Sequence, residues 1–351
     1  MKILIGSGTP EQLGRGVVQA FENAGWETHH LDTSPESPYY KPFIKPVRKI
    51  INALRIQRAP DTFESWSISN INWRSNRWRA AVEKIRPDVA LHLWGHRLNE
   101  ECMRRAAQTA PHICWMIEAR DRLSTPSGYV KKGLYRHLLV YAQNYAEELA
   151  AEGLTAHYLP HFAPFCMLQD SRPPVERTYD WCFLGSHSPW REECLAHMAR
   201  HFPHGIILGP RWKHALKKNP HLRPLTTDSY LDGPSSYALY LRSRVGLDIP
   251  SRREWTKNGV TMRVPELIAC GAHVLTSANA EMGRLPYFHR DRFTIFDGPE
   301  TLPDAMARAL EMVRNTGDDM RLAAAREASG YAMLVETVGR LMRPENFPPQ
   351  T

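Results

Sequence analysis

The residues with the clearest chemical potential are Arg263 and Glu266, which stand three positions apart shortly after Gly259. This spacing places both side chains on one face of a predicted helix. A guanidinium there can neutralise a phosphate, and a carboxylate can accept two hydrogen bonds from a sugar diol. The alternative is an ion pair between the two side chains on the protein surface. The spacing therefore indicates either a ligand site or a surface ion pair.

A second polar loop follows the apolar segment Asp180–Leu184, which has the composition of a strand. The loop begins with Gly185 and Ser186, and His187 and Arg191 come next, the latter on a predicted helix. Backbone amides at a helix start, a hydroxyl group and one arginine can together cradle a pyrophosphate. The loop is therefore a candidate phosphate site.

The first glycine-rich loop, with Gly6 and Gly8, also precedes a predicted helix and can expose backbone N–H groups at its positive end. It does not match the dinucleotide-binding pattern GxGxxG, because Glu11 replaces the third glycine. It does not match the phosphate loop GxxxxGK[ST] either, because no Lys-Ser or Lys-Thr follows. A nicotinamide enzyme and a P-loop kinase are both disfavoured. The loop either binds a ligand or is a tight turn that needs glycine for backbone reasons.

Positive charge is concentrated in one segment. The chain has a formal net charge of +8, and between Lys41 and Arg79 nine residues are basic and two are acidic. Basic side chains interleaved with Trp66, Trp73 and Trp78 suit a polyanion whose bases or sugar rings can stack. The alternative is a solvated basic helix whose aromatic residues pack in the core. The candidate polyanion-binding residues are Lys41, Lys45, Arg48, Lys49, Arg74 and Arg77.

The composition is that of a folded protein. Of its 351 residues, 42% are apolar and 23% are charged. A chain of this length usually exceeds the size of a domain with a single hydrophobic core, so two domains are expected. No apolar window is long enough for a membrane span, and the N-terminal MKILIGSGTPEQ lacks a signal-peptide core, which favours a cytoplasmic location. The six cysteines show no CxxC spacing, so neither structural zinc nor a disulfide framework is expected.

Short apolar runs alternate with helix-like stretches, which predicts an α/β protein with two parallel sheets. In the first half, strands are expected at Lys2–Ile5, Glu27–Leu31, Asp88–Trp94, His112–Ile117, Leu138–Ala142 and Ala156–Leu159. In the second half, they are expected at Asp180–Leu184, Gly205–Leu208, Arg244–Ile249, His273–Thr276 and Phe293–Phe296. The expected domains cover residues 1–165, with the basic aromatic insertion at about 39–79, and residues 175–320, followed by a helical tail over 321–351. Ligands bind at the carboxyl ends of such strands, so the cleft between the domains is the expected site.

At this point the motifs resemble the CgeB-like, or spore-maturation-type, glycosyltransferases of the GT-B fold. The resemblance rests on TMRVPELIACGAHVLT at residues 261–276, on YDWCFLGS at 179–186 with Arg191, and on residues 230–249. RPDVALHLWG, HICWMIEARD and LLVYAQNYAEELAAEGLTAHYLPHFA follow the same order more loosely in the first half. The resemblance implies two Rossmann-like domains whose parallel sheets face each other across a cleft, with a C-terminal helix that packs back.

The resemblance also implies transfer of a sugar from a nucleotide-activated donor, with the donor held mainly by the second domain and the acceptor by the first. The donor-binding residues implied in this way are Gly185, Ser186, His187, Arg191, Lys257, Arg263 and Glu266. Among them, Glu266 matches the position that binds the nucleotide ribose, and Arg263 and Lys257 would face the diphosphate. The donor would be UDP-linked and a co-substrate, with no cofactor.

Two departures from the larger families bear on the reaction. The large retaining families carry a second glutamate where this chain has Asn258, which leaves the stereochemistry open. No Asp-x-Asp occurs, which agrees with metal-independent chemistry in which cations and helix dipoles stabilise the leaving diphosphate. No metal site is therefore expected.

An inverting reaction needs a general base, because the acceptor alcohol loses its proton as it attacks the anomeric carbon. Glu118, at the end of the fourth strand, is the first candidate, and Asp121 lies close behind it. His96, just past the third strand, is the other, since GT-B enzymes often place a histidine there. Each could instead cap a helix or form hydrogen bonds in a cleft. His161 and His187 rank below these, and His92 is expected to pack in the core.

The sequence leaves several classes of acceptor possible. The basic aromatic segment indicates a polyanion, in its sharpest form a modified base in DNA that must be flipped out or single-stranded to reach a cleft. A small molecule, a protein or a surface polysaccharide is the alternative. A further alternative is a GT-B-like protein that binds a nucleotide or nucleic acid without turnover, which Asn258 favours and Arg263 with Glu266 disfavours.

Overall fold

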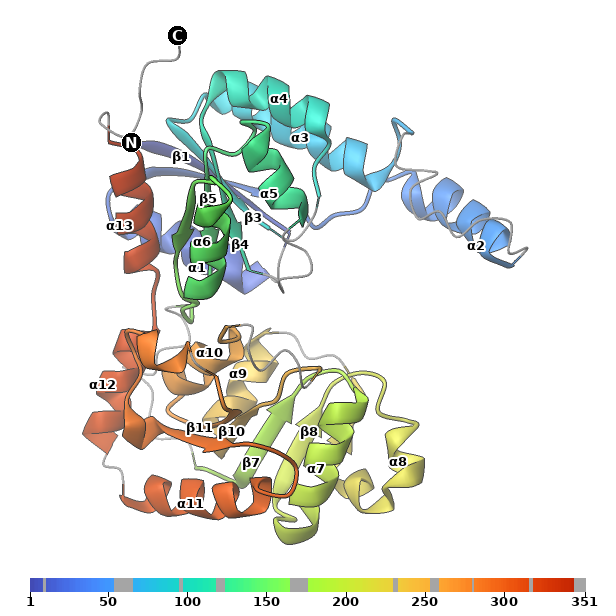
Figure 1. The fold of residues 1–351 in the computed structure, drawn as a ribbon. Helices are drawn as coiled ribbons and strands as arrows, with labels where there is room; N and C mark the ends of the chain where they lie inside the picture. The colour runs from blue at the N-terminus through green and yellow to red at the C-terminus, as the bar shows by residue number, and fades with distance from the viewer. Residues whose placement is uncertain are drawn as a thin grey trace. The chain divides into compact units, whose positions relative to one another are not determined.

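A computed structural model describes residues 1–8, 11–53, 66–94, 97–117, 124–164, 176–229, 233–252, 259–279, 281–315 and 318–343. The chain forms two compact units. Unit 1 consists of Met1–Leu159 and Ala332–Thr351, and unit 2 of Pro160–Tyr331. Each unit is built on one six-stranded parallel sheet with helices packed against it (Figure 1).

The sheet of unit 1 has the strand order β2-β1-β3-β4-β5-β6. Its strands are β1 (Lys2–Ser7), β2 (Glu27–Asp32), β3 (Val89–Leu93), β4 (His112–Met116), β5 (His137–Val140) and β6 (Ala156–Tyr158). Its helices are α1 (Glu11–Asn23), the π-helix η1 (Tyr40–Ile44), α2 (Lys45–Ala53), α3 (Asn70–Ile85), α4 (Glu100–Thr109), α5 (Ser124–Lys131), α6 (Gln143–Ala151) and α13 (Ala332–Leu341). β3 and β4 are buried along their whole length, as expected for central strands of a parallel sheet covered on both faces.

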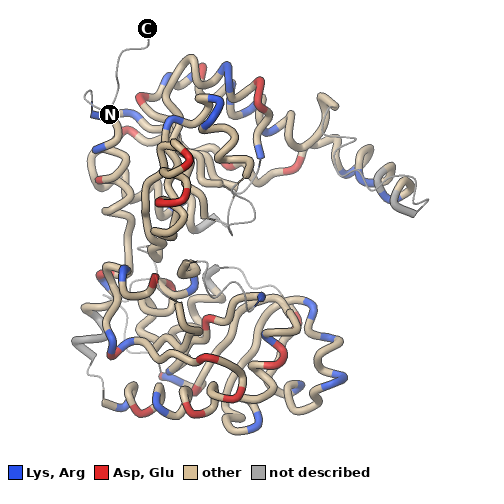
Figure 2. The backbone as a smooth tube through the Cα atoms, viewed as in Figure 1, with Lys and Arg blue, Asp and Glu red and all other residues tan. Residues whose placement is uncertain are grey.

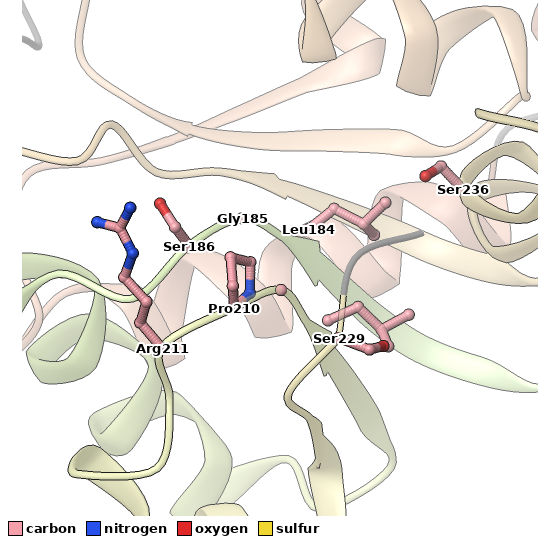
Figure 3. Close-up of a pocket in the computed structure, with 9 residues that line it drawn as sticks. Leu184, Gly185, Ser186, Pro210, Arg211, Ser229 and Ser236 are labelled. Atoms are coloured by element: carbon pink, nitrogen blue, oxygen red, sulfur yellow. The ribbon is translucent and has the colours of Figure 1, made fainter. Parts of the chain in front are cut away.

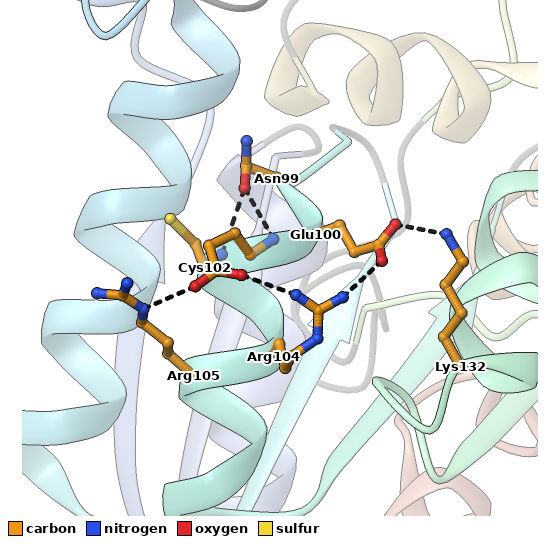
Figure 4. Close-up of polar contacts among 7 residues, drawn as sticks. Asn99, Glu100, Cys102, Arg104, Arg105 and Lys132 are labelled. Carbon is orange, nitrogen blue, oxygen red and sulfur yellow. Dashed lines mark hydrogen bonds and ion pairs between the residues drawn. The ribbon is translucent and has the colours of Figure 1, made fainter.

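The start of α4 is fixed by its N-cap residue, Asn99. The Oδ1 atom of Asn99 accepts hydrogen bonds from two backbone N–H groups of the first turn, at 2.9 and 3.3 Å (Figure 4). Such a cap stabilises a helix by about 1 kcal/mol. Two acidic residues of the same turn form ion pairs with Arg104, Arg105 and Lys132. These ion pairs are exposed and add little stability. The cap therefore determines where α4 begins.

The sheet of unit 2 has the strand order β12-β11-β10-β7-β8-β9. Its strands are β7 (Tyr179–Leu184), β8 (Gly205–Leu208), β9 (Thr226–Thr227), β10 (Ser243–Asp248), β11 (His273–Ser277) and β12 (Phe293–Phe296). Its α-helices are α7 (Pro189–His201), α8 (Ala215–Lys218), α9 (Gly233–Leu241), α10 (Arg263–Ala269), α11 (Leu302–Asn315) and α12 (Asp318–Ala328). The core of this unit includes the fully buried side chains of Trp181, Phe183 and Trp212.

The prediction of an α/β protein with two parallel sheets is confirmed, and every strand expected from the sequence is present close to its expected bounds. β9 was not expected, because a strand of two residues has no detectable period. Among the helices of the described ranges, none combines the length and the apolar composition that crossing a membrane requires.

The described part of the predicted helical tail contains two helices, α12 and α13. The chain turns at Gly330, whose φ of +81° is a conformation that favours glycine. α12 packs on α10 within unit 2, whereas α13 packs on α1 within unit 1. The expected C-terminal helix that packs back is therefore α13 alone.

Gly6 is a strand residue and not part of a loop. It lies in β1, where it pairs with Leu31 of β2 and His92 of β3. The ring of the fully buried Trp78 packs on it, and a Cβ atom added to Gly6 would lie 2.1 Å from that ring. The glycine is required by the close approach of α3 to β1. The expectation of a ligand-binding loop is thereby corrected for Gly6, while Gly8 follows the strand and is half-buried.

Replacing Gly6 with alanine should destabilise unit 1 by about 1–3 kcal/mol, because the added methyl group must displace a tryptophan ring in a packed core. Gly128→Ala in α5 is the matched control, since no atom lies within 4 Å of its added Cβ and alanine favours a helix. Urea unfolding followed by tryptophan fluorescence measures both variants. Equal stability of Gly6→Ala and wild type would contradict the packing described here.

Candidate functional site

The two halves of the unit 2 sheet meet between β7 and β10. From β7 the chain continues to β8 and β9 on one side, and then returns to β10, β11 and β12 on the other. In open α/β sheets, ligands bind at the carboxyl edge where the strand order reverses in this way. The loops after β7, β8 and β10 are therefore the candidate site.

Arg191 of α7 ties the loop after β7 to the loop after β10. The residue is 8% exposed; its Nε donates to the carbonyl oxygen of Ile249 at 2.9 Å, and its Nη1 donates to that of Ser186 at 2.8 Å. Burial, together with the positive charge of Arg263, lowers the pKa of Arg191 to about 9. Through these hydrogen bonds Arg191 positions the Ser186 loop, and its predicted contact with a diphosphate stays a prediction.

Asp248, the last residue of β10, is the counter-ion at this edge. Its Oδ1 accepts hydrogen bonds from Arg263 Nη1 and from Thr261 Oγ1, both at 2.8 Å. The guanidinium carbons of Arg191 and Arg263 lie 5.3 and 5.4 Å from the centroid of the Phe183 ring. Although burial opposes it, the negative charge of Asp248 raises the pKa of Arg263. The two cations thus share one aromatic ring, and Arg263 is the one that forms an ion pair with Asp248.

Glu266 lies one helical turn after Arg263 on α10, and no residue in the described part of the chain donates to its carboxylate or forms an ion pair with it. Arg263 turns to Asp248 instead, so the alternative of a mutual Arg263–Glu266 ion pair is wrong. Burial raises the pKa of Glu266 to about 7, although the charge of Arg263 lowers it. A half-buried carboxyl group in this state can accept hydrogen bonds from the hydroxyl groups of a ligand.

A pocket of about 350 Å³ opens at the carboxyl ends of β7 and β8 (Figure 3). It is lined by Leu184, Gly185, Ser186, Leu208, Gly209, Pro210, Arg211, Ser229 and Ser236. On α9, Ser236 lies one turn before the buried Tyr240. Burial, and then the charge of Glu266, raises the pKa of Tyr240 well above its usual value, so the phenol and the carboxyl group interact electrostatically. α9 therefore links the pocket to Glu266.

Close packing between the loops after β7 and β8 shapes the wall of the pocket. Gly209 has a φ of +149°, and a Cβ atom there would lie 2.1 Å from the carbonyl oxygen of Gly185. The same oxygen accepts a hydrogen bond from Trp212 Nε1 at 3.0 Å. Arg211 has a φ of +72°, a strained conformation for a residue with a side chain, and its exposed side chain lies beside Ser186 in Figure 3. Strain of this kind is common at functional sites, so Arg211 is an additional candidate.

His187 is engaged within the loop that follows β7. Its Nε2 lies 2.7 Å from Glu192 Oε2, and its ring stands edge-on to Trp212 with centroids 5.2 Å apart. Glu192 also accepts a hydrogen bond from Asn219 Nδ2 at 2.9 Å. This network fixes the first turn of α7. A direct donor contact of His187 stays a prediction.

Four of the candidate residues lie outside the described residues, namely His96, Glu118, Asp121 and Lys257. The catalytic base therefore stays a prediction. His161 is buried, and burial lowers its pKa to about 3. His92 is fully buried in unit 1 with its Nδ1 2.5 Å from the hydroxyl of Tyr135, so its expected place in the core is confirmed.

The basic segment divides into an exposed part and an internal part. The exposed lysines of η1 and α2 are Lys41, Lys45 and Lys49. The side chain of Arg48 lies outside the described residues. Trp66 is exposed, whereas Trp78 is buried in the core. For Trp78, the structure therefore agrees with the alternative of a basic helix whose aromatic residues pack in the core.

The two candidate polyanion-binding arginines of α3, Arg74 and Arg77, make contacts within unit 1. Arg74 is buried and donates to the carbonyl oxygens of Ser34 and Pro35 at 3.0 and 3.2 Å. It is therefore unavailable to a polyanion, which corrects that prediction. Arg77 donates to a backbone carbonyl of β2 at 3.1 Å and lies 4.7 Å from the centroid of the Trp73 ring.

Two residues of this edge, Asp248 and Arg211, were missed in the sequence. Asp248 ends the apolar run VGLD, and a carboxylate at the end of a buried strand is a signal that could have identified it. Arg211 carries no such signal, because its positive φ results from the packing of two loops.

Comparison with known proteins identifies both a family resemblance and a fold. Residues 191–335 match a family model described as glycosyl transferase-like. No match was found among curated proteins. Sucrose-phosphate synthase from Thermosynechococcus elongatus is 13% identical with a TM-score of 0.65, over 99% of both chains. A glycosyltransferase from Rickettsia africae ESF-5 is 9% identical with a TM-score of 0.62, over 99% of both chains. UDP-GlcNAc 2-epimerase from Neisseria meningitidis, bound to UDP-GlcNAc, is 12% identical with a TM-score of 0.53, over 97% of this chain and 100% of that one.

These solved structures show the fold. The chain has the GT-B fold with two Rossmann-like domains, as the sequence resemblance implied. The glycosyl transferase-like region contains Arg191, Asp248, Arg263 and Glu266, the residues that organise the candidate site.

The raised pKa of Glu266 predicts a pH-dependent stability of unit 2. The native carboxyl group holds its proton up to about pH 7, whereas the unfolded one loses it near 4.5. Because the native state then binds more protons, wild type should lose stability as the pH rises through this range. Glu266→Gln mimics the neutral form, so its stability relative to wild type should rise over the same range and level off above it.

Urea unfolding across this pH range measures the difference between Glu266→Gln and wild type. Glu193→Gln, which removes an exposed carboxylate from α7, is the matched control. If the difference for Glu266→Gln does not change with pH, the carboxyl group is not in the environment described.

Proposed function

We propose that this chain is a nucleotide-sugar-dependent glycosyltransferase of the CgeB-like type, and that unit 2 binds a UDP-linked donor along the carboxyl edge of β7, β8 and β10. The observation that carries the proposal is the carboxyl group of Glu266, which is half-buried, has a pKa of about 7 and has no hydrogen-bond partner in the described part of the chain. The glycosyl transferase-like match over residues 191–335 supports it, as does the likeness to a structure bound to UDP-GlcNAc.

Glu266 is assigned to the ribose of the donor. A carboxylate can accept one hydrogen bond from each hydroxyl of a vicinal diol, and hydrogen bonds to a charged group contribute about 1.5–3 kcal/mol each. These bonds favour the ionised form of the group. Binding of the donor should therefore lower the pKa of Glu266.

The pocket is assigned to the diphosphate. The exposed guanidinium of Arg211 and the hydroxyl groups of Ser186, Ser229 and Ser236 supply donors there. The thirteen-residue helix α7 begins just after this loop, capped by Ser188, and its positive end adds to the field. These groups stabilise the charge that develops on the leaving nucleoside diphosphate, and the proposed reaction uses no divalent metal ion.

Arg191, Arg263 and Asp248 act as positioning residues. Their contacts hold the loops after β7 and β10 and the start of α10 in place. In the transfer step, the acceptor oxygen bonds to the anomeric carbon, the bond from that carbon to the phosphate oxygen breaks, and the acceptor proton passes to a base. Glu118, Asp121 and His96 of unit 1 stay the predicted candidates for that base. A polyanionic acceptor also stays a prediction.

Glu266→Ala and Arg211→Ala should each weaken the binding of UDP at least tenfold, because each removes a charge-assisted hydrogen bond to the ligand. Lys213→Ala is the matched control, since it removes an exposed cation two residues from Arg211 that does not line the pocket. Its dissociation constant should stay within about twofold of wild type. Isothermal titration calorimetry with UDP gives all four constants.

Failure of UDP and the other nucleoside diphosphates to bind, or wild-type affinity in Glu266→Ala, would refute the proposed site.

Product analysis after incubation with UDP-sugars separates the possible activities. Transfer or hydrolysis releases UDP, whereas epimerisation keeps the nucleotide attached to an altered sugar. Binding without either change would show the non-catalytic alternative instead.

A further inference from the structure

η1 and α2 expose large apolar side chains to solvent. Phe43 is 59% exposed, Ile50 58% and Val47 39%. Tyr39, directly before η1, is 49% exposed, and its ring centroid lies 6.4 Å from that of Phe43. Apolar residues exposed as a group commonly mark an interaction surface.

These apolar residues lie on one side of the helical segment. Phe43, Val47 and Ile50 follow the spacing i, i+4, i+7 of an apolar helix face. The exposed lysines follow the spacing i, i+4, i+8, at Lys41, Lys45 and Lys49. Each lysine stands two positions from an apolar residue, and side chains two positions apart point about 200° from each other around a helix. One side of the segment is therefore apolar and the other is basic.

No acidic residue occurs between Tyr39 and Ala53, so the four basic residues of this segment, Lys41, Lys45, Arg48 and Lys49, have no carboxylate among them. In Figure 2, α2 carries Lys and Arg and no Asp or Glu. The segment thus combines an uncompensated positive charge with an exposed apolar face.

This combination distinguishes between two polyanionic partners. A nucleic acid would satisfy the lysines, but its phosphates would leave Val47 and Ile50 exposed to water, because aliphatic side chains offer no ring on which a base can stack. An anionic bilayer satisfies both faces, since the apolar residues enter the boundary between headgroups and acyl chains while the lysines contact the headgroup phosphates.

We propose that η1 and α2 form an interfacial helix that binds unit 1 to an anionic lipid surface. The helix lies in the plane of the headgroups, with Phe43, Val47 and Ile50 toward the acyl chains and the lysines toward the phosphates. This inference goes beyond the proposed sugar transfer and requires no nucleotide sugar, so either can fail without the other.

Sedimentation of the full chain with vesicles tests the proposal. We expect binding to phosphatidylcholine vesicles that contain about 30% phosphatidylglycerol, little binding to phosphatidylcholine alone, and release at high salt. Lys45→Glu combined with Lys49→Glu should lower the vesicle partition coefficient at least tenfold. The matched control, Lys217→Glu combined with Lys218→Glu, changes two exposed lysines of α8 and should leave it within about twofold.

The apolar face is tested separately with Ile50→Ser, which should lower the partition coefficient severalfold. Ile295→Ser is the matched control, since this isoleucine of β12 is 42% exposed in unit 2 and should not affect binding. Because the altered side chains are exposed, the variants should keep the wild-type unfolding temperature, which is measured in parallel.

Three results would overturn the proposal. The first is no binding to the anionic vesicles, or equal binding by the α2 and α8 charge variants. The second is binding of a DNA oligonucleotide that depends on the lysines but not on Ile50, which would assign the segment to nucleic acid. The third is a dimer that dissociates on Ile50→Ser while the vesicles are not bound, which would assign the apolar face to a second copy of the chain.

Discussion

Two arginines from different helices lie over one phenyl ring, and the carboxylate of Asp248 is the charge that makes this arrangement stable. Arg191 comes from α7 and Arg263 from α10, and both guanidinium carbons lie within 5.4 Å of the centroid of the Phe183 ring. Buried cations without a counter-charge are strongly destabilising, so the aspartate at the end of β10 is essential to this edge. Parallel pairing of β10 with β7 brings it to the ring.

The unpartnered carboxyl group follows from this ion pair. Because Asp248 occupies Arg263, the guanidinium does not neutralise Glu266 by direct contact, and burial raises the pKa of that carboxyl group to about 7. Arg191 holds two loops together, and among the described residues that line the pocket Arg211 is the exposed cation. The edge therefore separates positioning residues, which are buried and paired, from residues with free capacity for a ligand.

The strands and the shared face of α10 could be predicted from the sequence, because buried parallel strands are short apolar runs and residues three apart meet on a helix. The partner of Arg263 could not, since it depends on the end of β10 reaching α10 in space. The same holds for Arg74, whose carbonyl partners are some forty positions away in the sequence. The amphipathic spacing of α2 is visible in the sequence, but only the exposure of Phe43 and Ile50 shows that its apolar face is not part of the core.

Proton release on donor binding tests the central claim most directly, because it reports the ionisation of Glu266 itself. UDP-glucose is a suitable probe, since its diphosphate has no proton to lose near neutral pH. Calorimetry at pH 7 in two buffers of different ionisation enthalpy should show release of about half a proton from wild type and none from Glu266→Gln, because the group is half-protonated at a pKa of about 7. A binding enthalpy that is independent of the buffer in wild type, or equal proton release from Glu266→Gln, would contradict the account.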